Sequence, residues 1–469
     1  MKGTDFLQLD RAAAPSRGLT TWLADALRAA VIDGRLRPGA SLPASRVLAE
    51  ELGVSRGVIV EAYQRLKDEG MTIARHGAGT VVSGRLAQRA AASDATEMSF
   101  MPHRWRARGE IDLSPGVPDL SGFPRAAWLR AERTVLTRAN AADLGYGDPR
   151  GSQWLRHELA GWLARTRGLR ASPDDIIIVT GVAQALALLA QWLRAHDRQA
   201  IAVENPGSRG ARDELAYWGL APVSVDVDGD GLRVDDLTRR PGVRAVLLTP
   251  AHHFPTGVVL APQRRRDLLS WAVRAGGLVI EDDYDAEYRY DRTPVPAMQA
   301  SAPEHVVYAG STSKTLAPGL RLGWLIPPAA LHADLVTGKH ASDLGSPALP
   351  QLVLAQLIAS GELEQHIRLA RKRQRGRRDA LLAAVHEHLP DARVQGVAAG
   401  LHLLITFPAL AGQVSDADLA DQIGRAGVLV HPLSYHGERS EVPGLVMGYA
   451  AHTADQLREA ARRIGQLVR

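Results

Sequence analysis

The chain has 469 residues and no cysteine, which excludes disulfides, thiolate zinc sites and cysteine nucleophiles. This length predicts more than one domain, and a hydrophobic content of 45% is ample for a core. The net charge of +5 leaves nucleic acid open as a partner. Segment 1–15 has no apolar stretch of the kind found in signal peptides, so we expect a cytoplasmic protein.

The N-terminal segment predicts three short helices. Apolar residues recur at helical spacing over 20–34, where Thr20 or Thr21 can cap the start. A second helix is expected at about 44–51, and a third follows Gly53, with Ser55 as its cap. Two short helices joined by a tight glycine turn fit helix-turn-helix geometry.

Residues 71–83 alternate in polarity like a strand, with a Gly-Ala-Gly tip at 77–79. This pattern predicts a two-stranded wing after the third helix. Arg75 and His76 beside the tip could reach DNA phosphates or the minor groove.

The stretch GRLRPGASLPASRVLAEELGVSRGVIVEAYQRLKDEG, residues 34–70, resembles the winged-helix pattern of GntR-type regulators. Its most specific part, LP-x-SR-x-LA-x-x-LGVSR, runs from Leu42 to Arg56. The resemblance implies a DNA-binding domain over 1–82 that recognises a double-stranded DNA operator. Arg46 and Arg56 would be the leading contacts, and a solvated surface charge is the less favoured interpretation of each. The residues expected at the DNA are Ser45, Arg46, Ser55, Arg56, Gly57, Arg75 and His76.

Segment 83–110 is rich in Ala, Ser and Arg and shows no sustained apolar period, which predicts a flexible linker. Its RWRAR motif at 104–108 could touch DNA, but a solvated tether is the favoured interpretation.

Residues 176–193 form the longest uncharged run of the chain, long enough to raise a transmembrane interpretation. Gly181 interrupts this run, and Gln184 and Gln191 lie within it. We therefore expect a buried strand, a tight turn and a helix, and no membrane partner.

From Ile111 onward, short apolar runs alternate with helical segments. Runs of this kind are typical of parallel strands buried on both faces. The pattern predicts a doubly wound α/β sheet over 111–469, with ligands at the C-terminal ends of its strands. The runs are DIIIVTG, QAIAVEN, VRAVLLTP, GGLVIEDDYD and HVVYAGS.

Four groups at successive strand ends match the needs of pyridoxal 5′-phosphate (PLP). The turn at 180–184 opens a helix, where backbone N–H groups can bind a phosphate, and Arg321 could complete that site. Asp282 could hold a pyridinium nitrogen protonated, and Tyr284 could bond the phenolic oxygen. Lys314 could form a Schiff base, since buried lysines become nucleophilic. Each signal alone is common, whereas the four in this order predict a PLP site.

Residues 111–469 resemble the fold-type I aminotransferases, and the two halves together resemble the MocR/GabR family of GntR-type transcriptional regulators. The motifs that carry this resemblance are YGDPRG (146–151), TPAHHFPTG (249–257), EDDYDAEYRY (281–290) and SKTLAPGLRLG (313–323). The resemblance implies that Lys314 forms the Schiff base with PLP, that Asp282 lies at the pyridine nitrogen and that Tyr284 lies near O3′. It implies a phosphate site of Val182, Ala183, Ser311 and Arg321. It also implies a head-to-tail homodimer.

The chain departs from aminotransferases at the expected substrate side. Val446 stands where they carry the arginine that clamps the substrate carboxylate, which argues against efficient transamination of α-amino acids. Ser208 replaces the tyrosine usual in the family, and Phe254 precedes a proline where aminotransferases have an Asn-Pro pair. The O3′ hydrogen bond is then left to Tyr284, or to one of the histidines at 252–253.

Two further features have competing interpretations. The adjacent histidines 252–253 suggest a metal site, but neighbouring side chains on an extended segment point apart. Since no further ligand cluster is evident in the sequence, we expect no metal, a pocket-lining role for one histidine and a structural role for the other. The basic run RKRQRGRRD at 371–379 suggests a second DNA site, but a solvated helix face is favoured.

The leading hypothesis is a transcriptional regulator whose operator binding responds to PLP, or to an amine that condenses with it at Lys314. PLP as the signal would indicate control of vitamin B6 synthesis. GABA, taurine or another ω-amino acid would need a different arginine for its acid group, such as Arg209 or Arg212. The alternatives are a functional PLP-dependent aminotransferase with an appended DNA-binding domain, and a dimerisation scaffold without a cofactor. Whether the protein activates or represses is left open.

Overall fold

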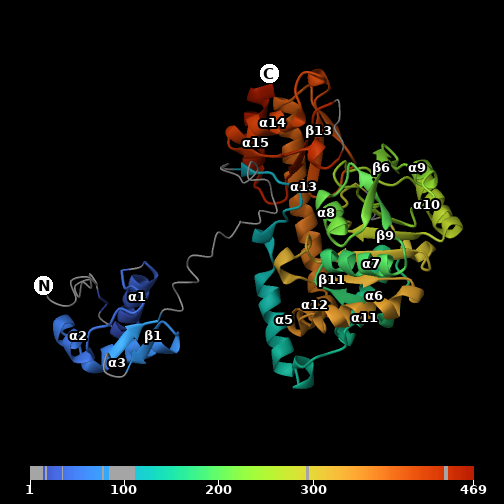
Figure 1. Ribbon diagram of the computed structural model, residues 1–469. Coiled ribbons are helices and arrows are strands. Elements are labelled where there is room, and N and C mark those ends of the chain that lie inside the picture. The colour runs from blue at the N-terminus through green and yellow to red at the C-terminus, as the bar shows by residue number, and fades with distance from the viewer. Residues whose placement is uncertain are drawn as a thin grey trace. The chain divides into compact units, whose positions relative to one another are not determined.

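The computed structural model divides into two compact units, Met1–Phe100 and Met101–Arg469 (Figure 1). The structure describes residues 14–15, 18–33, 35–75, 79–83, 111–291, 295–437 and 442–468. His76 and the predicted linker from residue 84 on, including the RWRAR motif, lie outside the described residues.

The first unit is a three-helix domain with a strand pair. Helices α1 (Leu19–Ile32), α2 (Ser45–Leu52) and α3 (Arg56–Asp68) precede strands β1 (Thr72–Arg75) and β2 (Gly79–Val82). The two strands are antiparallel, as expected for a wing. Apolar side chains at helical spacing pack into one core, which confirms the predicted winged helix. This core includes Leu23, Leu27, Leu48, Leu52, Ile59, Leu66 and Val82.

The predicted helix caps are only partly right. Gly18, with φ of 83°, is the N-cap of α1, and Thr20 and Thr21 lie inside the helix, so their predicted capping role is wrong. The left-handed backbone of Gly18 turns the chain into the helix before either threonine is reached. Ser55 does occupy the N-cap of α3, but its side chain makes no capping hydrogen bond. The Tyr63 hydroxyl instead donates to the Pro43 carbonyl oxygen at 2.9 Å and ties α3 to the turn before α2.

The second unit is built on an eight-stranded sheet with the order β4-β11-β10-β9-β8-β5-β6-β7. Five central strands are parallel to one another, in the order β10, β9, β8, β5 and β6. At the two ends of this group, β11 pairs antiparallel with β10 and β7 pairs antiparallel with β6. The strands are β4 (Ile177–Val179), β5 (Ala200–Asn205), β6 (Ala221–Asp228), β7 (Gly231–Leu232), β8 (Ala245–Leu248), β9 (Leu278–Asp283), β10 (Val306–Ser311) and β11 (Gly323–Ile326).

Helices cover both faces of this sheet, which confirms the predicted doubly wound fold. Ile201 and Val203 of β5 join the core beneath α7, while Ala202 between them joins the core beneath α10. Alternate residues of a strand point to opposite faces, so a strand buried on both sides is apolar throughout. The helices are α5 (Arg125–Arg138), α6 (Gln153–Arg167), α7 (Val182–Ala195), α8 (Arg209–Tyr217), α9 (Val234–Thr238), α10 (Pro262–Ala275), α11 (Ala329–Asp343) and α12 (Ala348–Ala359).

The uncharged run at 176–193 forms β4, a turn at Gly181 and most of α7, as expected. In the described part of the chain, no helix has both the length and the apolar character needed to cross a bilayer. The prediction of parallel pairing is wrong for β4, which pairs antiparallel with β11. Because β11 also runs antiparallel to β10, β4 keeps the direction of the parallel strands and its C-terminal end lies at the same edge.

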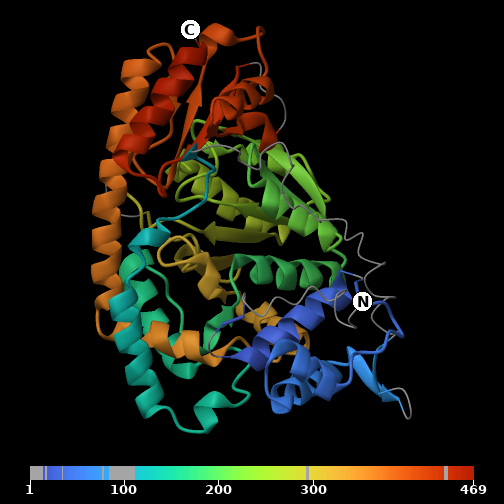
Figure 2. The same cartoon turned by 90° about the vertical axis from the view of Figure 1, so that its left-hand side faces the viewer.

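A smaller subdomain follows the sheet and surrounds its own core. Its antiparallel sheet has the order β12-β13-β16-β15, and a short parallel pair joins β14 to β3 near the start of the unit. Figures 1 and 2 show the long helix α13 extending from this subdomain along the larger one. The elements are β3 (Ile111–Asp112), α13 (Glu362–His388), β12 (Arg393–Gln395), β13 (His402–Thr406), α14 (Asp416–Arg425), β14 (Val428–Leu429), β15 (His431–Pro432), β16 (Gly444–Gly448) and α15 (Ala454–Val468).

Candidate functional site

A cavity of about 320 Å³ lies at the C-terminal edge of the parallel strands. We call it the cofactor cavity. All seven residues predicted from the sequence to bind PLP line it, although they come from four different strand ends. These are Val182, Ala183, Asp282, Tyr284, Ser311, Lys314 and Arg321.

One end of the cavity is suited to a phosphate group. Val182 and Ala183 begin α7, where backbone N–H groups have no intrahelical acceptor and the helix dipole favours an anion. Arg321 adds a guanidinium from a left-handed backbone position with φ of 51°. Gly181 has φ of 99°, and a Cβ placed there would lie 3.2 Å from Arg321 Nη2. The glycine therefore leaves the space that this guanidinium occupies.

Lys314 brings an amine into the cavity. Its Nζ donates a hydrogen bond to the carbonyl oxygen of Gly116 at 2.5 Å. Burial lowers the pKa of Lys314, against the opposing effect of the Asp285 and Asp282 carboxylates. A lowered pKa increases the share of neutral amine, which is the form that attacks an aldehyde.

Asp282 places a carboxyl in the same cavity. Burial, followed by repulsion from Asp283, raises its pKa to about 7, while Lys314 opposes this shift. Its Oδ1 is buried and has no hydrogen-bond partner within the described ranges. A buried carboxyl oxygen of this kind calls for a donor, and the protonated nitrogen of a pyridine ring is such a donor.

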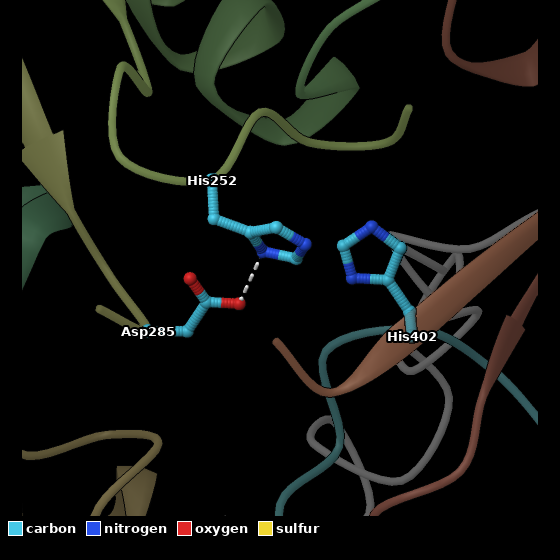
Figure 3. A group of neighbouring side chains, drawn as sticks. All are labelled: His252, Asp285 and His402. Carbon is cyan, nitrogen blue, oxygen red and sulfur yellow. Dashed lines mark hydrogen bonds and ion pairs between the residues drawn. The ribbon is translucent and has the colours of Figure 1, made fainter. Parts of the chain in front are cut away.

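Tyr284 connects the cavity to a buried histidine and aspartate. Its hydroxyl lies 3.2 Å from Nδ1 of His252, and this nitrogen lies 2.9 Å from Oδ2 of Asp285. His402 faces them from β13 and donates from Nε2 to the carbonyl oxygen of Pro255 at 3.1 Å. Figure 3 shows the His252, Asp285 and His402 side chains pointing toward one another.

His252, Asp285 and His402 are residues that could hold a metal, since one ligand atom of each lies within 4.8 Å of the others. The sequence showed no further ligand cluster beside His252, whereas the structure brings Asp285 and His402 to it. This group could not be recognised in the sequence, because His402 lies 150 positions after His252 and on another sheet. In the structure, the contact of the His252 imidazole with the Asp285 carboxylate holds the ring beside Tyr284.

His253 is turned away from this group. Its Nδ1 lies 2.7 Å from Thr256 Oγ1, and its Nε2 lies 3.5 Å from Oε2 of Glu204. The backbone N–H and the hydroxyl of Thr249 both donate to the same Glu204 oxygen. Burial raises the pKa of Glu204 to about 8 and lowers that of His253 to about 3. Sequence reasoning missed Glu204, and neither histidine of the pair lines the cofactor cavity.

Of the positions that depart from aminotransferases, Phe254 and Ser208 line the cavity and Val446 packs behind Phe254. Val446 is buried on β16 and packs with Leu404, Leu433 and Phe254, the last of which lines the cavity. Ser208 also lines the cavity, and its Oγ accepts the backbone N–H of Ala211 as the N-cap of α8.

The two arginines proposed for an effector acid group are engaged elsewhere. Arg209 forms an ion pair with Asp213 at 3.1 Å. Arg212 donates to the Ser224 hydroxyl at 3.0 Å. Neither arginine lines the cofactor cavity.

The predicted DNA contacts lie at the exposed starts of the helices of the first unit. Arg46, Ser55, Arg56 and Gly57 are exposed. Arg56 Nε lies 3.3 Å from the Oγ of Ser45, so α2 and α3 present these residues together. Arg75 is exposed at the end of β1, and His76 lies outside the described residues.

Comparisons with known proteins agree with both units. Residues 19–82 match the family model "Bacterial regulatory proteins, gntR family", and residues 108–464 match "Aminotransferase class I and II". Among solved structures, the chain is similar to a kynurenine aminotransferase of Pyrococcus horikoshii in complex with PMP. The TM-score is 0.70 and the identity 25%, over 76% of this chain and 90% of that one.

Two curated relatives span nearly the whole chain. The "HTH-type pyridoxine biosynthesis transcriptional regulator PdxR" of Corynebacterium glutamicum is 33% identical over 96% of both chains. The "Probable rhizopine catabolism regulatory protein MocR" of Rhizobium meliloti is 30% identical over 93% of this chain and 91% of its own. The chain therefore belongs to the MocR/PdxR-type HTH transcriptional regulators, in which a gntR-family domain is joined to an aminotransferase class I and II domain.

Proposed function

We propose that this transcriptional regulator binds PLP in the cofactor cavity and that its affinity for an operator responds to PLP, or to an amine that condenses with it at Lys314. The observation that supports this proposal is the convergence of an amine, a carboxyl and a phosphate-type anion site in one cavity. These are provided by Lys314, Asp282 and the start of α7 with Arg321.

Each residue would have a separate task. Val182, Ala183, Ser311 and Arg321 would hold the phosphate. Asp282 would accept a hydrogen bond from the pyridine nitrogen, and Tyr284 would donate to the phenolic oxygen. When bound, PLP supplies an aldehyde that reacts with amines, and the Lys314 amine would bond to it covalently.

The response at DNA requires that the effector binds two arrangements of the protein with different affinities. The domains that would take part are the DNA-binding domain at 1–82 and the effector domain at 111–469. A cytoplasmic head-to-tail homodimer, which the family resemblance implies, would recognise paired half-sites on double-stranded DNA. The name of the PdxR relative favours control of vitamin B6 synthesis as the biological role.

The second candidate function is an active aminotransferase. Its support is the complete set of PLP-type residues in the cavity. Among the described residues that line the cavity, Arg321 is the one arginine, and it belongs to the phosphate end. Val446 packs behind Phe254 and brings no cation to the wall. A carboxylate would therefore lack a clamp, and we expect at most a slow half-reaction with amino acids.

The test uses full-length protein stripped of cofactor and DNA from upstream of its own gene. DNA affinity is measured while PLP is titrated, for wild type, Lys314→Ala and the matched control Lys372→Ala, which changes an exposed lysine on α13. We expect wild type and the control to change affinity and Lys314→Ala to lose the change. A full response in Lys314→Ala would refute the mechanism.

Two further outcomes are informative. PLP uptake without a change at DNA would mean that a second molecule is sensed, and the titration would be repeated with amines in the presence of PLP. Failure of wild type to take up PLP, followed by its absorbance, would contradict the assignment of the cavity. Sustained turnover of an amino acid with a keto acid would favour the aminotransferase.

A further inference from the structure

A second cavity, of about 270 Å³, lies between α6, α13 and the segment that follows β9. We call it the arginine cavity. Apolar side chains, among them Trp162 and Ile367, form part of its wall. The charged residues that line it are Arg165, Arg167, Glu287, Glu364, Arg368 and Arg371.

Arg167 is the most deeply buried cation of this cavity, with 2% of its side chain exposed. Its Nε donates to Asp283 at 2.6 Å, and its Nη1 donates to the carbonyl oxygen of Val295 at 2.7 Å. Nη2 is buried and has no hydrogen-bond partner in the part of the chain that the structure describes. A buried guanidinium nitrogen without an acceptor is costly, and Arg167 lines the cavity, so an acceptor on a ligand bound there would satisfy this donor.

The charges around the cavity favour an anion. Four guanidinium groups face two carboxyl groups, and Glu364 is already paired with Arg165 at 3.5 Å. Burial and the Asp283 carboxylate raise the pKa of Glu287 to about 7. At neutral pH this carboxyl therefore carries only part of its negative charge. Arg167 is paired with Asp283 at 2.6 Å, so the excess positive charge of the wall comes from Arg368 and Arg371.

Two of the arginines that line the cavity lie on α13. Arg371 is the first residue of the basic run at 371–379, and Arg368 lies one helical turn before it. Arg373 and Arg377 of the run form ion pairs with Asp119, at 3.3 and 3.0 Å. Arg371 donates to the backbone carbonyl oxygen of Glu287 at 2.7 Å, which places its guanidinium at the cavity. Arg371, Arg373 and Arg377 therefore contact residues of the same unit, so the run is not a uniformly solvated helix face.

We propose that the arginine cavity is a binding site for a small oxyanion, either a phosphate or the carboxylate of a small organic acid. Guanidinium groups bind both in a bidentate manner. The volume is below the range usual for drug-sized ligands, so the ligand is small. The apolar part of the wall would contact the hydrocarbon portion of an organic acid.

The cavity is connected to the cofactor cavity through Asp283. This carboxylate binds Arg167 and also accepts the Tyr308 hydroxyl at 2.5 Å, and it directly follows Asp282 in β9. The same segment supplies Asp282 and Tyr284 to one cavity and Glu287 to the other. An oxyanion that binds Arg167 would weaken the hold of this arginine on Asp283 and change the field at Asp282. This coupling, unlike the site itself, rests on the proposed function.

The site is tested by calorimetric titration of the full-length protein with inorganic phosphate and, separately, with succinate. The variants are Arg368→Met and Arg371→Met, with Arg375→Met as the matched control, since Arg375 is an exposed residue of the same helix. A further variant, Arg321→Met, removes the phosphate end of the cofactor cavity. Arg167 is not substituted in this test, because its loss would leave the Asp283 carboxylate buried without a cationic partner.

We expect Kd to rise about ten-fold or more in Arg371→Met and Arg368→Met, as for a lost hydrogen bond to a charged group, and to stay unchanged in Arg375→Met. Binding must persist in Arg321→Met. If phosphate binding is lost only in Arg321→Met, or if no titrant binds wild type, the proposal is overturned. The tighter of the two titrants distinguishes a phosphate from a carboxylate ligand.

The coupling is tested by measuring PLP affinity with and without the tighter oxyanion. We expect a difference in wild type that disappears in Arg371→Met. Equal PLP affinities in wild type under both conditions would overturn the coupling while leaving the site. If PLP does not bind at all, the proposed function fails, and the calorimetric result still decides the oxyanion site.

Discussion

The buried carboxyl of Glu204 predicts a specific dependence of stability on pH. Burial raises the pKa of this group from 4.5 to about 8 in the folded protein. Between these values the unfolded chain releases the proton and the folded protein retains it. Rising pH therefore favours the unfolded state, and the contribution of Glu204 to stability is lost progressively from about pH 4.5 to about pH 8.

The substitution Glu204→Gln isolates this effect. The amide has the shape of the protonated acid, and its oxygen can accept the backbone N–H and the hydroxyl of Thr249, as Oε2 does at 2.9 and 3.0 Å. Each pH unit in the window contributes about 1.4 kcal/mol to the free energy of unfolding. Between pH 5 and pH 7.5 the variant should therefore gain about 3 kcal/mol relative to wild type.

The assay is guanidinium unfolding of the full-length, cofactor-stripped protein, followed by far-UV circular dichroism at pH 5.0 and 7.5. Glu304→Gln, which changes an exposed glutamate, is the matched control and should follow wild type at both values. Equal pH dependences for wild type and Glu204→Gln would show that Glu204 is ionised in the folded protein. The reasoning from burial would then be refuted.

Three further substitutions test other parts of the structure. Gly181→Ala should weaken PLP binding about ten-fold in an absorbance titration. The new Cβ would require Arg321 to move, and the alanine backbone would be strained at a φ of 99°. Arg167→Met should destabilise the second unit by about 3–5 kcal/mol in chemical unfolding, because it leaves the Asp283 carboxylate buried without its cation. Tyr63→Phe should cost about 1 kcal/mol in the unfolding of the winged-helix unit, since it removes one hydrogen bond to a backbone carbonyl. A change below about 0.5 kcal/mol in either stability test would contradict these assignments.

The main features of the fold could be predicted from local sequence patterns. Fully apolar runs indicated strands buried on both faces, and all five runs form strands of the large sheet. The rule that ligands lie at the C-terminal ends of such strands predicted that Val182, Asp282 and Lys314 lie together, and Arg321 was expected to complete the phosphate site. The structure places these residues around one cavity because the parallel strands end at a common edge, where the antiparallel strand β11 begins just after Arg321.

The features that the sequence did not reveal depend on contacts between distant segments. His252 meets Asp285 across 33 positions, and His402 approaches from the smaller subdomain. The arginine cavity joins Arg167 of α6 to Arg371 of α13, which are far apart in the chain. No periodicity connects such pairs, so the sequence showed two histidines and a basic run whose partners were not visible. The antiparallel placement of β11 was missed for the same reason.

The apolar residue Phe254 in the cavity wall leads to a prediction about the effector. The Phe254 ring lies against His436, with ring centroids 4.9 Å apart, and burial lowers the pKa of His436 to about 3. This imidazole is therefore neutral, and Arg209 is paired with Asp213. Beyond Lys314 and Arg321, which the proposed PLP site uses, the described lining of the cavity offers no cation to the carboxylate of GABA or the sulfonate of taurine.

We therefore predict that PLP alone produces most of the response at DNA, and that neither GABA nor taurine adds more than about two-fold to the change in Kd, a difference well below 1 kcal/mol. DNA affinity measured with saturating PLP, with and without 10 mM of each acid as a chosen excess, checks this. A larger effect would mean that Arg209 leaves Asp213 to bind the acid group. Arg209→Met would then abolish the effect of the amine on DNA affinity and leave the effect of PLP. In a protein that responds to PLP alone, Arg209→Met would not change the DNA affinity.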